Sequence, residues 1–262
     1  MALPGLAGKT VVITGAASGQ GLAEALLLVA SGASVVATDL AETAPVELAH
    51  PGISYHRLDV SSPDDWERLA GRLTKNELPV DGLVNNAGVP FRARLGEIKL
   101  EDWNRVIAIN LTGPMLGIQA MLPFMPRGAS IVNVGSSAAL TPHHTVAYTA
   151  SKWGLRGLSA VATTEFGSRG IRTNIVHPGY IQTTMMMSAP AIMAEAQIAL
   201  TPLERLGQAG EVAAVVCFLL SDLASYISGA EIPVDGGFTS SMGVKVMSDA
   251  IRSSPDRPEH HR

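Results

Sequence analysis

Short apolar runs alternate along the chain with longer segments in which apolar residues recur at helical spacing. The run TVVITG at 10–15 precedes a helical segment that begins near Gly19, and SVVATD at 34–39 follows it. A strand, a helix and a strand in this order form a βαβ unit with parallel strands. The same alternation predicts five further strands, at 54–59, 81–86, 130–136, 171–176 and 230–235.

Several of these strands are apolar along their whole length instead of at every second residue, as in VVIT and SIVNV. Strands of this kind are buried on both faces, which happens in a parallel sheet covered by helices on both sides. We therefore expect an α/β fold, a single doubly wound Rossmann domain over about residues 1–240. A polar C-terminal tail is expected at 241–262, because the chain ends in SSPDRPEHHR.

Composition and charge exclude several classes of partner. The formal net charge is −4 and Lys and Arg are scattered singly, so no basic stretch favours nucleic acid or an anionic membrane. The start MALPGLAGKT lacks a secretion signal, and no window reaches the ~18 uninterrupted apolar residues of a membrane span. These observations predict a cytoplasmic protein. Its one cysteine, Cys217, lies in the apolar run VAAVVCFLL and is interpreted as a buried structural thiol.

A glycine-rich loop, TGAASGQG, lies between the first strand and its helix. Small residues here let backbone N–H groups approach a pyrophosphate at the helix N-terminus, where unpaired amides and the helix dipole favour anions. The loop alone is also compatible with an ordinary tight turn. However, the second strand ends in Asp39, near the spacing at which a carboxylate meets the adenosine ribose of a dinucleotide.

Asp39 also indicates which nicotinamide cofactor binds. A carboxylate accepts hydrogen bonds from the ribose hydroxyls but repels a 2′-phosphate. Neither Ser18 in the loop nor Leu40 after the acid is basic, so neither offers a cation to that phosphate. The sequence therefore predicts NAD and not NADP.

Other unusual residues also follow predicted strands. Asp59 ends the third strand, NNAG at 85–88 follows the fourth, Ser136 follows the fifth and HPGYIQT at 177–183 follows the sixth. Each segment alone is compatible with a turn. In an open parallel sheet, however, ligands bind outside the carboxyl ends of the strands, so their joint placement predicts one site at that edge.

The segment AYTASKWGL places Tyr148 four residues before Lys152. Positions i and i+4 of a helix share a face, so both side chains can point into one cleft. A nearby ammonium favours the phenolate, so we expect Lys152 to lower the pKa of Tyr148 from its usual value of about 10. The pair then suits alcohol oxidation, in which Tyr148 takes the hydroxyl proton while hydride leaves for the cofactor.

Taken together, TGAASGQG, NNAG, YTASK, HPGYIQT and VDGG, in this order and spacing, resemble the short-chain dehydrogenase/reductase family of NAD(P)-dependent oxidoreductases. The resemblance runs from about residue 7 to 238. The segment YTASKWGLRGLSAVATTEFG is similar in sequence to the matching segment of bacterial hydroxysteroid dehydrogenases of the family.

The resemblance implies a role for each of four catalytic residues. Tyr148 matches the general acid/base, and Lys152 matches the lysine that also holds the nicotinamide ribose. Ser136 matches the serine that polarises the substrate oxygen, and Asn110 in IAINLTG matches the asparagine that anchors a water linking the lysine to solvent. Asn110 is also compatible with a helix-interrupting polar residue bonded to the backbone.

The serine has an alternative, because NVGSSAALTPHHTVAY offers both Ser136 and Ser137. Aligning Asn133 with the asparagine usual in this strand favours Ser136, and leaves a loop one residue shorter than in many members. Ser137 would point to the opposite side if the strand continued. His143 and His144 lie in that loop, where one of them contacts substrate or both are exposed.

The resemblance also implies a set of cofactor contacts and no metal site. The matching positions are Gly15, Ser18, Gln20 and Gly21 in the loop, Asp59 and Val60 beside the adenine, Asn86 and Gly88 beneath the adenosine, and Pro178, Ile181 and Thr183 at the carboxamide. The family usually has an aliphatic residue where Gln20 stands. Its backbone amide is what the phosphate needs.

The segment at 184–207, TMMMSAPAIMAEAQIALTPLERLG, is rich in methionine and alanine. In the family this segment is a mobile lid over the substrate. Methionines adapt to irregular apolar surfaces, so we expect an apolar secondary alcohol or ketone, alicyclic or steroid-like. The other interpretation is a lid that only packs on the core.

The helices predicted at about 101–122 and 147–168 are apolar around much of their circumference. Such helices must bury more than one face. The resemblance implies that they form a dimer interface within a homotetramer.

Two other functions fit the sequence less well than an NAD-dependent dehydrogenase. An NADPH-dependent 3-oxoacyl thioester reductase is disfavoured by Asp39 and the missing basic partner. A catalytically idle NAD-sensing regulator is disfavoured because the chain retains the tyrosine, lysine, serine and asparagine together.

Overall fold

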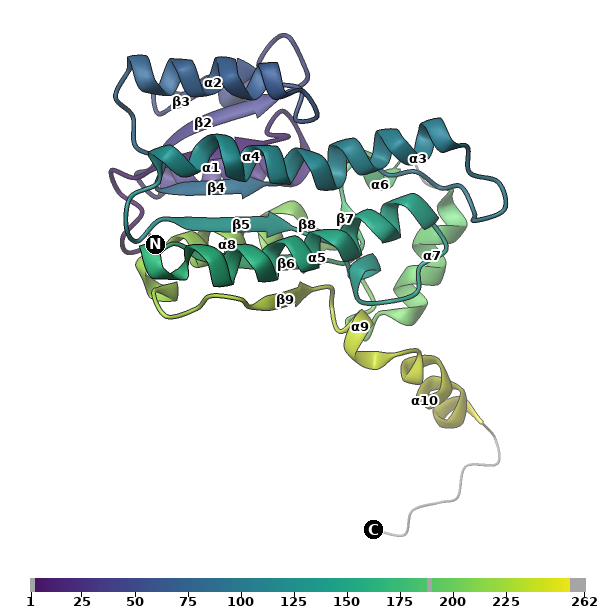
Figure 1. Ribbon diagram of the computed structural model, residues 1–262. Helices are drawn as coiled ribbons and strands as arrows, with labels where there is room; N and C mark the ends of the chain where they lie inside the picture. Colours follow the sequence, from purple (N-terminus) through teal and green to yellow (C-terminus); the bar gives the residue numbers. More distant parts are fainter. Residues whose placement is uncertain (1–2, 188–189, 255–262) are drawn as a thin grey trace.

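The computed structural model describes residues 3–187 and 190–254, and places a central sheet between two layers of helices (Figure 1). The main sheet has seven strands, all parallel, in the order β3-β2-β1-β4-β5-β6-β9. Their bounds are Thr10–Thr14 (β1), Ser34–Asp39 (β2), Ile53–Arg57 (β3), Gly82–Asn85 (β4), Ser130–Val134 (β5), Arg172–Pro178 (β6) and Glu231–Val234 (β9). The doubly wound fold and its predicted strands are therefore confirmed.

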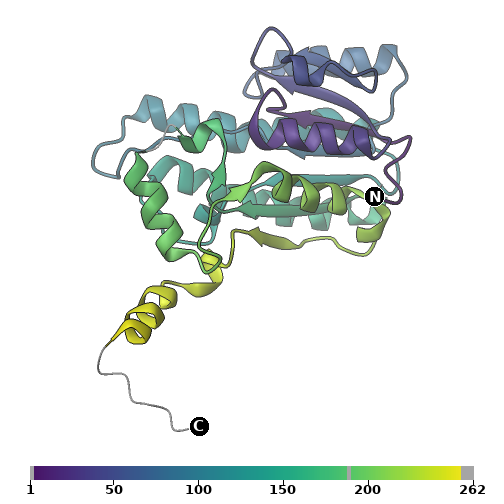
Figure 2. The same ribbon diagram turned by 180° about the vertical axis from the view of Figure 1, so that it is seen from behind.

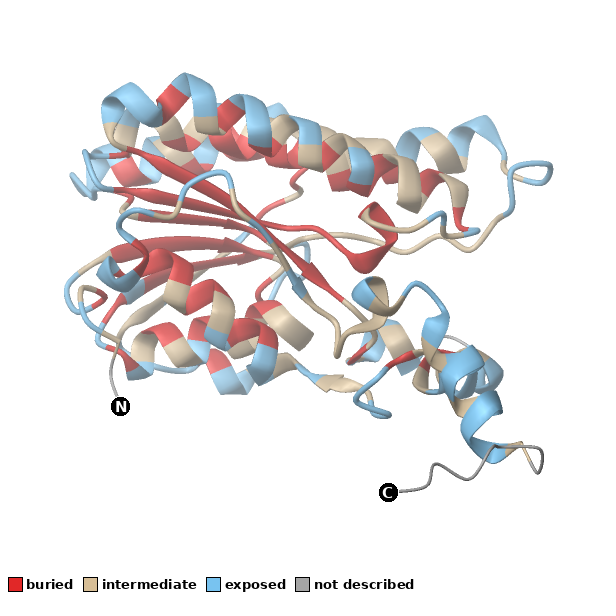
Figure 3. Cartoon of the chain, turned by 90° about the horizontal axis from the view of Figure 1, so that it is seen from below, coloured by how far each residue is buried: buried red, intermediate tan, exposed pale blue. Residues whose placement is uncertain are grey.

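Helices cover both faces of the sheet. On one face lie α1 (Gly19–Ala30) and α8 (Ala209–Leu220), which Figure 2 shows in front of the strands. The other face is covered by α2 (Pro63–Lys75), α4 (Gly113–Met121) and α5 (Val146–Phe166). The apolar side chains accordingly form two clusters, one on each side of the sheet, and Figure 3 shows burial concentrated in the strands and the inner faces of the helices.

The strands explain why this arrangement forms. Every residue of β1 and β5 is buried, and most of their side chains are β-branched. Such side chains fit a pleated surface, and strands apolar on both faces need helices on both sides. The order of the strands reverses between β1 and β4, which opens a crevice at the carboxyl end of the sheet.

The helix predicted at 101–122 is interrupted in its middle. Helix α3 (Leu100–Ile107) continues through a π-helical segment, η2 (Ala108–Thr112), into α4. Short π-helical segments inside α-helices are frequent at functional sites. Asn110 lies within this one.

The continuous helix Leu100–Phe124 is long and apolar enough to cross a membrane by length and composition alone. In this fold it packs against β4, α2 and α5, and its residues Ile118 and Met121 belong to the core cluster beside the sheet. We interpret it as a core helix, because core helices meet the same criteria of length and composition.

The segment predicted as a lid leaves the main sheet and returns to it. A separate parallel pair, β7 (Ile181–Gln182) with β8 (Gly207–Gln208), joins its two ends and was not predicted. Between them, α6 (Thr184–Met187) and α7 (Ala191–Leu200) lie beyond the carboxyl ends of the strands (Figure 1). Residues 188–189 of the predicted lid lie outside the described residues.

The prediction of a polar tail at 241–262 is wrong for its first part. Helix α9 (Phe238–Ser241) is followed by α10 (Val244–Ser253), which extends away from the sheet (Figure 1). Lys245 pairs with Glu204 at 3.0 Å and with Asp249, so the helix is joined to the end of the lid segment. Apolar residues recur at helical spacing along α10, a pattern that the polar end of the chain obscures. Residues 255–262 lie outside the described residues.

A carboxylic acid lies buried in α1, which packs against α8. Glu24 is fully buried, and among the described residues neither of its carboxylate oxygens has a hydrogen-bond partner. Burial raises the pKa of Glu24 to about 8. Burial, followed by the nearby Glu24, also raises the pKa of Cys217 to about 12, which confirms the buried thiol predicted from the sequence.

Glu24 should make the protein less stable as the pH rises. The folded protein keeps the proton up to about pH 8, whereas Glu24 in the unfolded chain ionises above its ordinary value of 4.5. The stability that neutral Glu24 contributes is therefore fully present below pH 4.5. It is lost by about 1.4 kcal/mol per pH unit as the pH rises toward 8. Chemical denaturation of Glu24→Gln across this range should give a flatter slope than the wild type. The exposed Glu165→Gln is the matched control, and a parallel slope in Glu24→Gln would refute the assignment.

Candidate active site

A cavity of about 480 Å³ lies at the carboxyl ends of the strands, within the range of small-molecule sites. It brings together residues from the glycine loop, the ends of β2, β3, β4, β5 and β6, α5 and the lid. Of the residues singled out from the sequence, the following line it: Gly15, Ser18, Gln20, Asp39, Asp59, Val60, Asn86, Gly88, Ser136, Tyr148, Lys152, Pro178, Ile181 and Thr183. Gly21 and Asn110 lie behind this lining.

Two glycines allow close backbone packing around the start of α1. Gly15 has a φ of +68°, and a Cβ there would lie 2.9 Å from the Cα of Ala87. A Cβ at Gly21 would lie 2.3 Å from the carbonyl oxygen of Gly15. The N-cap residue Ser18 forms no capping hydrogen bond with its side chain. The start of α1 is thus a narrow cradle whose amides suit an anion.

Asp39 lies beside this loop, at the end of β2. Its Oδ2 accepts a hydrogen bond from the N–H of Ala17 at 3.0 Å, and its Oδ1 accepts one from Ala41 at 3.3 Å. Among the described residues that line this end of the cavity, no Lys or Arg accompanies Asp39 and Asp59. The carboxylate is therefore held in place at an end of the cavity with no cation to match a 2′-phosphate.

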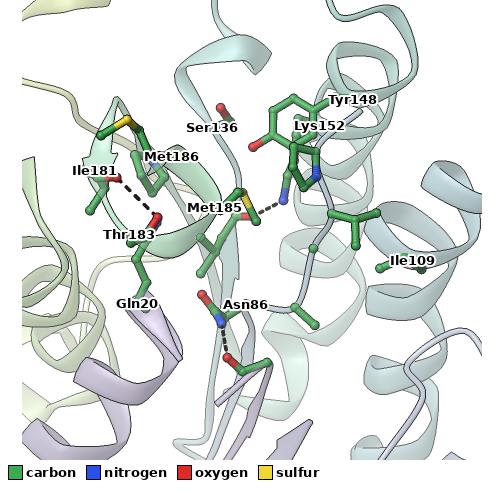
Figure 4. Close-up of a pocket in the computed structure, with 18 of the residues that line it drawn as sticks. Gln20, Asn86, Ile109, Ser136, Tyr148, Lys152, Ile181, Thr183, Met185 and Met186 are labelled. Carbon is green, nitrogen blue, oxygen red and sulfur yellow. Dashed lines mark hydrogen bonds between the residues drawn. The ribbon is translucent and has the colours of Figure 1, made fainter. Parts of the chain in front are cut away.

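The NNAG segment is tied to the glycine loop by hydrogen bonds. The Nδ2 of Asn86 donates to the carbonyl oxygens of Thr14 at 2.9 Å and Gly15 at 3.0 Å. The Oγ1 of Thr14 accepts from the backbone N–H groups of Asn86 at 3.1 Å and Ala87 at 3.0 Å. Figure 4 shows Asn86 below Tyr148 and Lys152, where these bonds fix the floor of the cavity.

Tyr148 and Lys152 project from α5 to the same part of the cavity (Figure 4). Lys152 is only 3% exposed, and its Nζ donates to the carbonyl oxygen of Val134 at 2.7 Å. Burial lowers the pKa of Lys152 to about 8. Its Nζ lies 5.8 Å from the centre of the Tyr148 ring, so the two side chains form one cluster.

The expectation of a lowered tyrosine pKa is wrong for this structure. Burial raises the pKa of Tyr148, a hydrogen bond with Ser136 opposes the change, and the nearby Tyr180 adds to it. The ammonium of Lys152 is directed to the backbone of Val134, so the loss of water around the phenol dominates. Tyr148 is therefore held as a neutral phenol.

Ser136 is the serine that meets the tyrosine. It is buried, its Oγ accepts a hydrogen bond from the N–H of Ala138 at 3.1 Å, and it lies near enough to Tyr148 to oppose the rise in the pKa of that residue. Ser137 also lines the cavity. Strand β5 ends at Val134, so the alternation of side chains does not separate the two serines. The contact with Tyr148 favours Ser136.

Asn110 is fully buried in the π-helical segment and is satisfied by its neighbours. Its Oδ1 accepts from the N–H of Val89 at 2.9 Å, and its Nδ2 donates to the Val89 carbonyl at 3.0 Å and to Ser151 Oγ at 3.2 Å. These bonds match the interpretation of a polar helix residue bonded to backbone. The role of Asn110 in anchoring a water stays a prediction.

His177 supports Ser136 from behind and was not predicted. It is fully buried, its Nδ1 lies 3.1 Å from the carbonyl oxygen of Ser136, and its Nε2 lies 3.4 Å from Glu231 Oε2. Burial lowers the pKa of His177, although Glu231 acts in the opposite direction. The imidazole thus lies between the end of β5 and the Glu231 carboxylate of β9. Gly135 leaves it room, because a Cβ there would lie 2.6 Å from the His177 ring.

Three polar side chains at the lid end of the cavity were also missed or left open. His143 lines the cavity whereas its neighbour His144 does not, and the Nε2 of His143 lies 3.4 Å from the hydroxyl of Tyr180. Arg92 lines the same end, where its Nη2 donates to the carbonyl oxygen of Met185 at 3.2 Å. Only their positions shortly after predicted strands could have drawn attention to Arg92 and Tyr180.

Comparisons with known proteins agree with this geometry. A family model described as enoyl-(acyl carrier protein) reductase matches residues 15–239. A crystal structure of a short-chain glucose/ribitol dehydrogenase from Brucella melitensis superposes with a TM-score of 0.84, at 33% identity over 91% of this chain and 99% of that one. The chain belongs to the short-chain dehydrogenase/reductase family. The family predicted from the motifs is thereby confirmed.

Two relatives are similar along nearly their whole length. Trans-4-hydroxycyclohexanecarboxylate dehydrogenase of Sinomonas cyclohexanicum is 36% identical, over 89% of this chain and 94% of the relative. The 3-oxoacyl-(acyl-carrier-protein) reductase of Thermotoga maritima is 38% identical, over 88% of this chain and 98% of the relative. This short-chain dehydrogenase/reductase is therefore an enzyme, an oxidoreductase that acts on CH–OH groups with a nicotinamide cofactor.

The residues present fit such a cofactor. Gly15 and Gly21 let the loop pack closely on the segment after β4, because a Cβ at either position would clash with backbone or with Asn86, and this close packing is expected of a dinucleotide-binding loop. The Oε1 of Gln20, at the start of α1, is buried and has no hydrogen-bond partner among the described residues. The helix terminus suits a pyrophosphate, and the Gln20 oxygen is an acceptor that could take a hydrogen bond from a hydroxyl of an attached ribose.

Proposed function

We propose that this enzyme transfers a hydride between NAD(H) and an apolar secondary alcohol or ketone of alicyclic or steroid-like shape. One observation carries the proposal: a single cavity has the glycine cradle and Asp39 at one end, and Tyr148, Lys152 and Ser136 under a methionine-rich lid at the other. The similarity to a dehydrogenase named for a hydroxycyclohexane substrate supports an alicyclic ring.

Cofactor binding falls to the loop and the strand ends. Gly15, Ser18, Gln20 and Gly21 would hold the pyrophosphate, and Asp39 the adenosine ribose. Asp59, Val60, Asn86 and Gly88 would surround the adenosine, and Pro178, Ile181 and Thr183 the carboxamide. When bound, the nicotinamide supplies the site for the hydride.

Proton transfer is the role of side chains from α5 and from the segment that follows β5. The neutral hydroxyl of Tyr148 is in the form that donates a proton to a ketone oxygen, and it takes the proton back when an alcohol is oxidised. Ser136 lies near Tyr148 and can hold the same substrate oxygen. Lys152, whose pKa is lowered to about 8, lies near enough to stabilise the phenolate while the proton is on the substrate.

The lid determines the shape of the substrate space. Met185 and Met186 of α6 and Met193 of α7 line the cavity, and Figure 4 shows Met185 on the side toward Tyr148 and Lys152. Thioether side chains are flexible and apolar, so they fit a ring better than a phosphorylated chain.

A 3-oxoacyl thioester reductase is the second candidate, because the Thermotoga relative has comparable identity. Such a reductase would use NADPH, and the carboxylate of Asp39 beside the cradle opposes its 2′-phosphate. A panel assay separates the candidates. Cyclohexanols, steroids and terpenoid alcohols with NAD, and a 3-oxoacyl thioester with NADPH, are followed by the absorbance of the reduced cofactor. Turnover of the thioester alone would overturn the proposal.

Asp39→Ala should erode the preference for NAD. We expect the ratio of kcat/KM with NAD to that with NADP to fall at least about tenfold, because hydrogen bonds to a charged group are lost and the repulsion of the phosphate disappears. Steady-state kinetics with both cofactors measure the ratio. Glu47→Ala, an exposed acid in the segment after β2, is the matched control. An unchanged ratio in Asp39→Ala would remove Asp39 from its assigned position.

The predicted partners remain proposals. Trp153 is 48% exposed and Val161 is 59% exposed on α5, so an apolar face of this helix is open in the monomer. The exposure of this apolar face supports a homotetramer built from dimers, in which a second copy would cover the face. We also propose a cytoplasmic location and no nucleic-acid or membrane partner, as the sequence predicted.

A further inference from the structure

The charged residues that line the cavity are divided by sign. Asp39 and Asp59 lie at the end expected to hold the adenosine. Arg92 and Lys152 are the Lys and Arg side chains among the described lining residues. Lys152 is buried and donates to the backbone of Val134. Arg92 lies beside the lid, where its Nη2 donates to the carbonyl oxygen of Met185.

Arg92 is held against the lid. It is half-buried in the loop that follows NNAG, and its Nη2 donates to the carbonyl oxygen of Met185 at 3.2 Å. Met185 and Met193 line the same part of the cavity. The guanidinium therefore lies at the border of an apolar chamber, where charge-assisted hydrogen bonds are stronger than in water.

Two neutral hydrogen-bonding groups lie near the guanidinium. Tyr180 and His143 line the same cavity as Arg92, and burial, opposed by the charge of Arg92, raises the pKa of the Tyr180 hydroxyl. Tyr180 in turn raises the pKa of Tyr148 and lies 3.4 Å from His143 Nε2. Tyr180 and His143 thus form a polar pair in the cavity that Tyr148 and Arg92 also line.

We propose that the substrate of this enzyme carries a carboxylate, which Arg92 binds with help from the Tyr180 hydroxyl while the alcohol or ketone carbon lies at Tyr148. This inference rests on the proposed function and names the substrate class of the same site. A guanidinium fork matches a carboxylate in geometry, and the methionines of the lid suit the ring between the two polar ends. The structure thereby favours an alicyclic hydroxy or oxo acid over a steroid without an acidic group.

The test uses pairs of probes that differ only in charge. Cyclohexanecarboxylate and cyclohexanecarboxamide are titrated into the full-length enzyme with NADH, and heat of binding gives both affinities. The 4-hydroxy forms of both compounds are then assayed as substrates with NAD. The wild type should prefer the carboxylate in both measurements, and Arg92→Gln should weaken it by about tenfold to a hundredfold while changing the amide little. Arg92→Lys should restore part of the loss.

Control variants distinguish a carboxylate-binding role of Arg92 from a role in supporting the lid. Arg94→Gln changes an exposed arginine in the same loop and should leave both affinities unchanged. If Arg92→Gln weakened the carboxylate and the amide equally, Arg92 would act through Met185 and the subsite would be overturned. Equal affinities of the wild type for the carboxylate and the amide would also overturn it. Charge-selective binding without NAD-dependent turnover of any alcohol would support the subsite and contradict the proposed function.

Discussion

Replacing Tyr148 with phenylalanine should lower kcat by about a thousandfold, which is within the usual contribution of a positioned general acid or base. The substitution removes the hydroxyl that transfers the proton and leaves the ring in place. NADH binding should remain near that of the wild type, because the glycine cradle and Asp39 lie at the other end of the cavity. Steady-state kinetics and NADH fluorescence titration measure the two quantities.

Tyr226→Phe is the matched control for this substitution. Tyr226 is fully exposed outside the cavity, so its hydroxyl should not affect kcat or cofactor affinity. If Tyr148→Phe kept more than about a tenth of the wild-type kcat, Tyr148 would not be the acid/base.

Gly21→Ala should damage both stability and cofactor binding. The added Cβ would lie 2.3 Å from the Gly15 carbonyl oxygen and 2.5 Å from the Asn86 side chain. Relief requires the loop to move, so we expect a loss of about 3 kcal/mol in the free energy of unfolding and at least tenfold weaker NAD binding, roughly what overpacking costs elsewhere. Denaturant titration and calorimetry measure these effects.

Gly71→Ala provides the opposite result with the same chemical change. Gly71 lies in α2, where an added Cβ meets nothing within 4 Å. Alanine has the higher helix propensity, so this variant should gain about 0.5–1 kcal/mol and bind NAD normally. Wild-type stability and affinity in Gly21→Ala would contradict the cradle.

The sheet could be predicted from the sequence because its strands are nearly continuous apolar runs. The runs at β1, β2 and β5 have no competing interpretation, since they are short, β-branched and separated by helical spacing. The β7–β8 pair could not be predicted in this way. Each of its strands has two residues, too few to show a period, and their pairing depends on the path of the lid.

The placement of the site followed from topology, but its electrostatics did not. The strand ends identify which residues meet at one edge, so the glycine loop, Asp39, Ser136 and Tyr148 could be expected together. The pKa of Tyr148 depends on how much protein surrounds the phenol and on where the Lys152 ammonium points, and both are properties of the packed structure. The sequence therefore predicted the wrong direction for the pKa shift of Tyr148.

His177 and Arg92 show a second limit of sequence reasoning. His177 precedes the proline of HPGY, where a turn residue explains the pattern, and only the fold places it behind Ser136. Arg92 is one of many scattered basic residues in the chain. Its importance comes from the lid, which brings the Met185 carbonyl and the cavity to its side chain.

The central claim is direct hydride transfer between the substrate carbinol carbon and NAD(H) in this cavity. The most direct measurement supplies 4-hydroxycyclohexanecarboxylate deuterated at the carbinol carbon, with NAD and the wild-type enzyme, and determines the mass of the NADH formed. The account predicts NADH that carries the deuterium of the alcohol and is formed far more slowly by Tyr148→Phe. NADH without deuterium, or equal rates of formation in both proteins, would contradict it.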